Sequence, residues 1–577
     1  MTNDRWNDFV NPPAKYRGAP FWAWNTKIEK EVIKKQIPIF AEMGFGGYHV
    51  HVRVGMDTPY MSEEYLELVK ECKKTGEEHG LRTYLYDEDR WPSGFGGGKV
   101  TEDPKYRMKH LLFTTRPYSG QTIERDPNRM ANFAMAVRSE NGELRACYDI
   151  VTDEKGCLKS FRRIAESEVV QGTRWYAYVE TNPVHSWYND TTYVDVLSKD
   201  AIDCFIQNTH EKYREVLGEN FGKTIPSIFT DEPHMLFKTN LKTGLDKEDL
   251  FLTWTEELEI RFKQEAGKEI WDCLPEIFWE KSVDDDEQFR YIYHKICSDL
   301  FEEAFSENIG EWCREHNIDF TGHYLYEETL EQQTRADGDL LRMYRHMDAP
   351  GMDLLFNMVA LTTGKQIQSI VRQFGKKGAM SEEYGVTNWS FDFRSFKFQG
   401  DWQAALGITL RVPHLSMMSM EGEAKRDFPA SIFYQAPWYK QFKHLEDHFA
   451  RINVALEEGC SRVRLGIIHP LESYWIKYGP EDQTGKVRAE LEEHFQQLIQ
   501  WLLINGIDFD YISEGILAEQ KQEMDGHLCV GDMAYTCVVV PGCITLRETT
   551  LKVLEQFAQD GGSIMNLGEF PQAVNGK

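Results

Sequence analysis

The sequence has too little positive charge and too few long apolar stretches for several classes of protein. It has 65 Lys and Arg against 93 Asp and Glu, a formal net charge of −28, so no surplus of cations can replace the counterions of a nucleic acid. No window approaches the roughly 20 apolar residues that a membrane-spanning helix needs. Residues 1–6 lack the basic and apolar segments of a secretory signal. We therefore expect no nucleic-acid partner and no membrane partner.

Several sequence motifs that contain cysteine or glycine are also absent. The 11 Cys are an odd number and form no CxxC pair, which is typical of a reducing compartment and predicts a cytoplasmic location. No GxSxG nucleophile elbow is present, which argues against a serine hydrolase. The glycine-rich segment 94–98 follows a predicted strand but lacks the GxxxxGK[ST] order of a phosphate-binding loop.

What the sequence does contain is a long alternation of predicted strands and helices. With 577 residues, the chain is long enough for at least two domains. Eight βα units predict a (β/α)8 TIM barrel over residues 1–458, since an open sheet would have fewer units. The predicted strands are 19–24, 47–53, 82–86, 226–231, 319–324, 352–355, 379–382 and 407–410.

Two insertions and a second unit complete the predicted organisation. Short β-like runs such as 132–137 and 175–179 predict an inserted β subdomain at about 108–190, and a mainly helical insertion is expected at about 236–285. Residues 459–577 predict an α/β domain of the flavodoxin type, whose completeness the sequence leaves open.

The ends of the predicted barrel strands are unusually polar. In a parallel barrel these ends converge on one mouth, where catalytic residues lie. Carboxylates gathered there suggest acid–base chemistry on a neutral substrate, a divalent cation, or both. The candidates are His49, His51, Arg53, Asp87, Glu88, Asp89, Asp231, Glu232, His323, Glu382 and Glu383, with Trp91 and Trp389 as aromatic platforms for a sugar.

Glu232 and Glu382 form the strongest catalytic pair. They end the fourth and seventh predicted strands, so they can face each other across the barrel mouth. Glycosidic cleavage needs one carboxylic acid that protonates the leaving oxygen, and a second carboxylate that attacks the anomeric carbon or activates water. The alternative for either residue is a structural role as a helix cap or ion-pair partner.

His49 and His51 allow more than one interpretation. A spacing of two in a strand places both imidazoles on one face, where they could hold a metal, bind substrate hydroxyls or serve the core. Arg53 continues the same face and would oppose a cation. The acidic run Asp87–Asp89 could bind calcium through its oxygens, or it could be a solvated turn neutralised by Arg90 or Lys99.

Four segments resemble the bacterial α-L-rhamnosidases of glycoside hydrolase family 106. They are Pro-Phe-Trp-Ala-Trp-Asn at 20–25, Gly-Gly-Tyr-His-Val-His-Val-Arg at 46–53, Tyr-Asp-Glu-Asp-Arg-Trp-Pro-Ser-Gly at 86–94 and Ser-Glu-Glu-Tyr-Gly at 381–385. The resemblance covers the barrel from about residue 20 to residue 438. It continues into the second unit, which is similar to the glutamine-amidotransferase-like domain of several barrel glycosidases.

The resemblance implies a glycosidase that releases a terminal sugar, with calcium as the candidate cofactor. Glu232 would be the general acid, and Glu382 the general base or nucleophile. The family suggests inversion, whereas glutamates on strands four and seven are also found in retaining barrels, and the carboxylate separation decides between them. Two other hypotheses stay open: a metal-dependent barrel hydrolase centred on His49 and His51, and a catalytically silent sugar-binding protein. A homo-oligomer is also left open.

Overall fold

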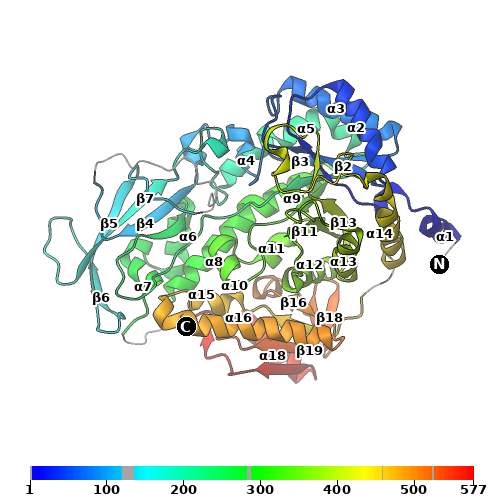
Figure 1. The fold of residues 1–577 in the computed structure, drawn as a ribbon. Helices are drawn as coiled ribbons and strands as arrows, with labels where there is room; N and C mark the ends of the chain where they lie inside the picture. The colour runs from blue at the N-terminus through cyan, green and yellow to red at the C-terminus, as the bar shows by residue number, and fades with distance from the viewer. Residues whose placement is uncertain (1–2, 120–134, 283–287, 458, 460, 523–524) are drawn as a thin grey trace.

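The centre of the molecule is a parallel sheet that closes on itself (Figure 1). The computed structural model describes residues 3–119, 135–282, 288–457, 459, 461–522 and 525–577. The sheet has the strand order β13-β12-β11-β10-β8-β3-β2-β1-β14. Its strands are β1 (Phe21–Trp24), β2 (Gly47–Val52), β3 (Arg82–Tyr86), β8 (Ser227–Thr230), β10 (Asp319–Gly322), β11 (Ala349–Leu354), β12 (Ala379–Glu383), β13 (Ile408–Pro413) and β14 (Ser416–Met417).

One chain segment closes the barrel. β13 pairs with β12, and β14, which follows it directly, pairs in parallel with β1. The first and last strands are therefore joined, as in a (β/α)8 barrel. Each of the eight predicted strands overlaps an observed one, and the predicted TIM barrel is confirmed.

Helices connect the barrel strands and cover the outside of the barrel. Between β2 and β3 lies α3 (Glu63–Glu78), which begins at a capping residue: the Ser62 hydroxyl accepts a hydrogen bond from the backbone N–H of Tyr65 at 3.1 Å. The segment 199–217 forms two helices that meet at Thr209. The helices of the barrel are α2 (Lys30–Glu42), α3 (Glu63–Glu78), α4 (Lys199–Asn208), α5 (His210–Leu217), α8 (Phe289–Phe301), α9 (Asn308–Glu315), α10 (Leu330–Ala336), α11 (Leu340–Tyr344), α12 (Leu361–Gln373), α13 (Phe393–Ala405) and α14 (Lys443–Leu456).

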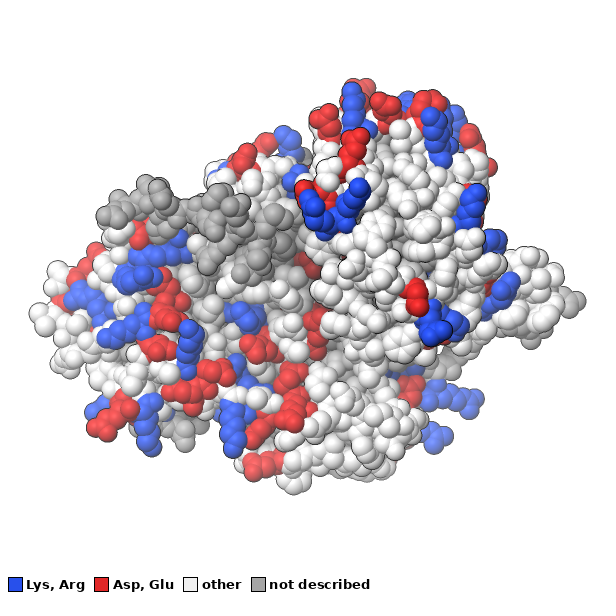
Figure 2. Space-filling view, viewed as in Figure 1, with Lys and Arg blue, Asp and Glu red and all other residues white. Residues whose placement is uncertain are grey.

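An antiparallel sheet stands to one side of the barrel, on the left in Figure 1. Its order is β6-β5-β7-β4-β9, with β4 (Lys109–Thr114), β5 (Glu143–Thr152), β6 (Leu158–Arg163), β7 (Thr173–Thr181) and β9 (Leu250–Trp254). The predicted run 175–179 lies in β7, whereas residues 132–134 of the run 132–137 lie outside the described residues. Figure 2 shows Lys and Arg interspersed with Asp and Glu over this part of the surface.

The strand β9 is an element of the segment 236–285 that the prediction of a mainly helical insertion did not include. This segment does contain α6 (Glu256–Ala266) and α7 (Leu274–Phe278), but β9 precedes them and pairs antiparallel with β4. The sequence Leu-Phe-Leu-Thr-Trp alternates in the strand period, and it buries Leu252 and Trp254. The second insertion thus supplies the edge strand of the sheet that the first insertion begins.

The C-terminal part of the chain forms a smaller parallel sheet at the bottom of Figure 1. Its order is β16-β15-β19-β21, with β15 (Leu465–Ile468), β16 (Asp510–Ile512), β19 (Cys537–Pro541) and β21 (Ser563–Leu567). The helices α16 (Glu481–Ile504) and α18 (Glu548–Gln559) accompany it. None of the helices in the described segments has the length and apolar content needed to cross a membrane.

An apolar plug fills part of the barrel interior and forms the base on which the polar strand ends stand. Its buried side chains come from six of the strands, from the link between β13 and β14 and from the loop after β14, so they pack inside the barrel as layers of inward-facing residues do. They are Phe21, Ala23, Tyr86, Phe229, Met380, Val412, Leu415, Met417 and Ala424.

A buried ion pair holds the closing strand against the last barrel helix. The two guanidinium Nη atoms of Arg411 donate to the Glu446 carboxylate at 2.7 and 2.8 Å, and the same carboxylate accepts from the backbone N–H of Gly18 at 3.0 Å. Both side chains of the pair are almost fully buried. Glu446 thus links β13, α14 and the segment that enters β1.

We expect Glu446→Ala to lower the free energy of unfolding by about 3–5 kcal/mol, because it leaves the Arg411 charge buried and unpaired. The measurement is urea denaturation followed by tryptophan fluorescence. Lys443→Ala is the control: it removes an ion pair with Asp447 from the exposed side of the same helix, and such pairs contribute about 0–1 kcal/mol. Equal effects of the two substitutions would show that the buried pair does not stabilise barrel closure.

Candidate active site

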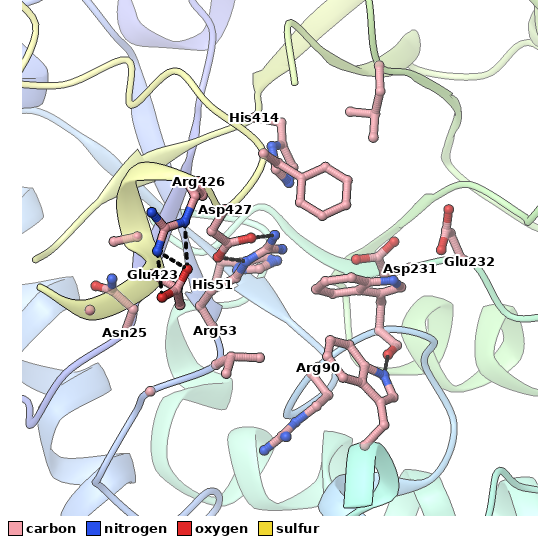
Figure 3. A pocket seen from close by; sticks show the side chains of 18 of the residues that line it. Asn25, His51, Arg53, Arg90, Asp231, Glu232, His414, Glu423, Arg426 and Asp427 are labelled. Carbon is pink, nitrogen blue, oxygen red and sulfur yellow. Dashed lines mark hydrogen bonds and ion pairs between the residues drawn. The ribbon is translucent and has the colours of Figure 1, made fainter. Parts of the chain in front are cut away.

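A cavity of about 1330 Å³ opens where the barrel strands end (Figure 3). Strand ends and the loops that follow them form its walls, as expected for a barrel active site. Among the predicted residues, those that line it are His51, Arg53, Trp91, Asp231, Glu232 and Glu382. The cavity therefore brings together predicted residues that are up to 331 positions apart in the chain, from residue 51 to residue 382.

Glu232 lies just after β8 in a constrained backbone conformation. Its φ of 46° is in the left-handed region, which non-glycine residues rarely adopt and which persists where the surroundings impose it, often at functional sites. The side chain is half-buried and lines the cavity. Burial, and then the charges of Asp231, Asp353 and Glu382, raise the pKa of Glu232 well above its usual range.

Glu382 lies in β12 and lines the same cavity with 5% of its surface exposed. Its carboxylate has a fixed partner, since the Nε2 atom of His323 lies 2.9 Å from Oε2. The same nitrogen lies 3.5 Å from the Asp231 carboxylate. Burial and then the charge of Asp231 raise the pKa of Glu382 well above its usual range, although the positive charge of Arg53 opposes this rise.

Asp231 belongs to the hydrogen-bonded base of the cavity. The Tyr86 hydroxyl donates to its carboxylate at 2.5 Å, and its backbone N–H donates to the Ser93 hydroxyl at 2.8 Å. Burial raises the pKa of Asp231, whereas His323, Tyr86 and Arg53 act in the opposite direction. Asp231 thus contacts His323, and it places a negative charge near both Glu232 and Glu382.

Asp353 and His414 are among the residues of the cavity wall that sequence reasoning missed. Asp353 of β11 lies in register with Glu382 of the adjacent strand, and burial followed by the charge of Glu382 raises its pKa well above its usual range. His414 lies between β13 and β14, with Nε2 at 3.8 Å from Glu382 Oε1. The sequence could have indicated Asp353, because it lies in the predicted strand 352–355, next to the predicted strand that ends in Glu382. No such signal exists for His414, which follows the predicted strand 407–410 by several residues.

The comparisons with known proteins agree with this geometry. Residues 186–574, more than half of the chain, match the profile of the glycoside hydrolase 106 family, described as alpha-L-rhamnosidase. The chain belongs to this family. The family is one of enzymes that hydrolyse glycosides, so the protein is a glycosidase. Among curated proteins, no sequence matches the chain.

Solved structures of other glycosidases share the fold of this family 106 member. A rhamnosidase from Novosphingobium sp. PP1Y has a TM-score of 0.68 at 13% identity, with 99% of this chain and 70% of that chain covered. β-Galactosidases from Rahnella sp. R3 and Halorubrum lacusprofundi have TM-scores of 0.51 and 0.53 at 12% identity. These matches cover 96% and 95% of this chain, and 71% and 72% of the two β-galactosidase chains.

In the glycosidase, Arg53 forms a clamp across the cavity wall (Figure 3). Its Nε and Nη2 atoms donate to the two carboxylate oxygens of Asp427 at 2.8 and 2.6 Å. The guanidinium carbon lies 4.4 Å from the ring centre of Trp91 and 5.3 Å from that of Phe428. Arg53 therefore joins the end of β2 to the loop after β3 and to the loop after β14.

The acidic turn Asp87–Asp89 serves the protein scaffold. The Glu88 carboxylate accepts backbone N–H bonds from Gly94, Gly96 and Gly97 at 3.0, 2.8 and 2.6 Å. Asp87 accepts from the Ser93 hydroxyl at 2.5 Å, and Asp89 pairs with Arg90 at 2.8 Å. Calcium needs six to eight oxygen ligands. Glu88 and Asp89 are engaged by these contacts, whereas Oδ2 of Asp87 has no hydrogen-bond partner among the described residues, so the turn alone offers few oxygens for calcium.

Three other candidates lie outside the cavity lining. His49 is buried two residues below His51, with Nδ1 at 2.9 Å from the backbone oxygen of Ala19. Glu383 is buried beside Glu382, on the opposite side of the strand because side chains alternate. Trp389 is 40% exposed, and its indole N–H donates to the Lys425 backbone oxygen at 3.3 Å.

Within the described segments, one group of His, Cys, Asp and Glu side chains could share a metal ion. It consists of Asp231, His323 and Glu382, whose ligand atoms lie within 4.8 Å of one another. His49 and His51 do not belong to it. Two carboxylates and an imidazole are also an ordinary hydrogen-bonded network, which is how the distances of 2.9 and 3.5 Å from His323 arrange them.

The clamp predicts how the loop after β14 affects substrate binding. We expect Asp427→Asn to raise KM for an aryl glycoside about tenfold with little change in kcat, because the substitution loosens the cavity wall but leaves the catalytic side chains in place. A tenfold change corresponds to the loss of roughly one charge-assisted hydrogen bond. Steady-state kinetics measures this.

The matched control is Glu423→Gln in the same loop. It removes the exposed pair between Glu423 and Arg426, which should contribute little. A fall in kcat without a change in KM, or equal effects of both substitutions, would contradict a clamp that positions the wall.

Proposed function

We propose that this glycosidase releases terminal α-L-rhamnose from a glycoside, with Glu232 as the general acid and Glu382 as the general base or nucleophile. The observation that carries the proposal is that both side chains line one cavity at the ends of β8 and β12. Family 106 membership and the fold shared with a rhamnosidase support the choice of sugar. Glycosidases use two carboxylates in these roles.

The surroundings of the two glutamates support the division of roles. A general acid must hold its proton at the working pH, and burial and the surrounding carboxylates all act to raise the pKa of Glu232. The second carboxylate must be ionised. Burial and Asp231 raise the pKa of Glu382 as well, but the positive charge of Arg53 opposes this rise, and the imidazole of His323 at 2.9 Å offers its carboxylate a polar partner.

The remaining cavity residues would bind and orient the sugar. Trp91 offers an aromatic face, and Asp231 acts through His323, which orients the Glu382 carboxylate. Nuclear magnetic resonance of the first-formed product distinguishes the two chemical routes: retention assigns Glu382 as the nucleophile, and inversion assigns it as the base for water.

Glutamine substitutions separate the two roles. We expect Glu382→Gln to lower kcat on every rhamnoside by about 10²–10⁴-fold, the usual contribution of such a group. Glu232→Gln should cause a similar loss on an alkyl rhamnoside but a much smaller one on a nitrophenyl rhamnoside, because a good leaving group needs no proton. Steady-state kinetics on both substrates measures this.

Glu383→Gln is the matched control, since it changes the adjacent glutamate, which does not line the cavity. It should leave kcat within a few-fold of the wild type. Equal losses for Glu232→Gln on both leaving groups would exclude Glu232 as the acid, and turnover of no rhamnoside by the wild type would exclude the proposed sugar.

Calcium remains part of the proposal at a different place from the acidic turn. The oxygens that suit it are those of Asp231, Asp353 and Glu382, and Oδ1 of Asp353 is buried without a hydrogen-bond partner among the described residues. A bound ion would neutralise carboxylates that otherwise repel one another, and it would hold sugar hydroxyls.

We expect the purified protein to contain about one calcium ion per chain, and chelation to lower its melting temperature by several degrees, as loss of a native-state ligand does. Mass spectrometry of the metal content and calorimetry are the measurements. Asp353→Asn should reduce the calcium content, while Glu88→Gln at the acidic turn should not. A metal-free protein whose melting temperature does not respond to added calcium would rule the ion out.

A further inference from the structure

Two histidines at the cavity have ring nitrogens that the protein leaves without partners. His51 ends β2 and is 1% exposed, and His414 lies between β13 and β14 and is 4% exposed. Both line the cavity and are labelled in Figure 3. Within the described residues, neither nitrogen of His51 has a hydrogen-bond partner, and the same holds for Nδ1 of His414. Buried polar atoms are normally paired, so these nitrogens point to a ligand.

Aromatic contacts fix the orientation of the two rings. Phe21 of β1 contacts both: its ring centre lies 4.4 Å from that of His51 and 6.2 Å from that of His414. Tyr86 contacts His51 with ring centres 4.3 Å apart. Rings packed in this way have lost rotational freedom, so their polar edges are held in place before a ligand binds.

The position of His414 connects this pair to the reacting groups. Its Nε2 atom lies 3.8 Å from Oε1 of Glu382, so a molecule that touches this ring also approaches the proposed catalytic carboxylate. Glu382 itself is held from the other side by His323. The two histidines therefore belong to the subsite of the sugar that is released, not to the outer cavity where the leaving group would lie.

Charge decides which chemical group the pair can recognise. Four carboxylate side chains line the same cavity, so a carboxylate on the bound sugar would meet like charges; they are Asp231, Glu232, Asp353 and Glu382. Neutral imidazole offers one donor and one acceptor. That combination matches a hydroxyl group, which also donates and accepts, whereas a carboxylate or phosphate would require donors only.

His49 provides an internal comparison within the same strand. Its ring contacts Phe21 and it lies on the same face of β2 as His51. Its Nε2 atom also has no hydrogen-bond partner among the described residues, but its Nδ1 atom is 2.9 Å from the backbone oxygen of Ala19 and the residue does not line the cavity. The two histidines of the His-Val-His segment thus differ in surroundings: the deeper one serves the barrel interior, and the outer one faces the cavity.

We propose that His51 and His414 bind ring hydroxyls of the released sugar, and that they select a neutral, hydroxylated sugar over a uronic acid. This rests on the proposed function, because it assigns the pair to the sugar subsite of the same reaction. Each ring would donate to or accept from one hydroxyl, and neither would take part in proton transfer.

A substrate–variant cycle tests the assignment. The probes are nitrophenyl α-L-rhamnoside and its 2-, 3- and 4-deoxy analogues, used with the wild type, His51→Leu and His414→Leu. Each substitution should lower kcat/KM on the parent glycoside about tenfold or more, as expected for a lost hydrogen bond to a buried group. On the one analogue that lacks the recognised hydroxyl, the same substitution should change kcat/KM less than about threefold.

Two further variants serve as controls. His51→Gln keeps a donor and an acceptor, and should recover part of the loss. His49→Leu should lower the melting temperature, and any loss of kcat/KM should be equal across the parent and all deoxy analogues. Calorimetric melting of each variant checks that it folds.

The outcomes separate this inference from the proposed function. Wild-type turnover of the parent glycoside tests the function alone. Given that turnover, an equal loss across all deoxy analogues for His51→Leu and His414→Leu would overturn the hydroxyl assignment and leave a structural role. Faster wild-type turnover of the matching nitrophenyl uronide than of the rhamnoside would overturn the selection of a neutral sugar.

Discussion

The site depends on one electrostatic constraint, the burial of several carboxylates in one partly dehydrated cavity. Desolvation and mutual repulsion both favour the protonated forms, so the cavity shifts the pKa values of Glu232, Asp353 and Glu382 upward. Such a group of charges is unfavourable for folding, and it persists because other interactions fix its members. His323 supplies a polar partner for Glu382, and Arg53 supplies positive charge nearby. The asymmetry of these partners is what distinguishes one glutamate from the other, since Glu232 receives only influences that favour its proton.

The polar residues around the carboxylates are mostly scaffold for that constraint. The run Asp87–Asp89 is acidic in the sequence and suggests a cation site, yet Glu88 gathers three backbone N–H groups of the glycine-rich loop. The loop is thereby held beside Ser93, which in turn contacts Asp87 and the backbone of Asp231. A carboxylate that accepts several N–H bonds acts much as a helix cap does, because it satisfies orphan donors that a tight glycine turn leaves behind. Charge in the sequence therefore does not by itself distinguish a ligand-binding carboxylate from an architectural one.

Strand periodicity carried most of what the sequence predicted. The eight barrel strands were located from apolar runs and their polar ends, and this was enough to bring Glu232 and Glu382 to one cavity because parallel strands share a mouth. The prediction failed where a contact is set by tertiary structure. His414 follows its strand through a change of pairing partner from β12 to β1, so no local period places it in the cavity. Likewise β9 was missed, because its pairing partner β4 lies about 140 positions earlier in the chain.

The C-terminal sheet contacts α12, the helix that lies between two strands of the barrel. α12 connects β11, which carries Asp353, to β12, which carries Glu382. The side chain of Gln373 at its end donates to the backbone oxygen of Tyr511 in β16 at 2.8 Å, and the buried Lys365 pairs with Asp508 at 2.8 Å. Displacement of this helix would shift both strands, and a carboxylate misplaced by about 1 Å can cost a large part of a catalytic effect. The second unit is thus a support for the two strands that carry these cavity carboxylates, which gives a physical reason for a family match that runs from the barrel into this sheet.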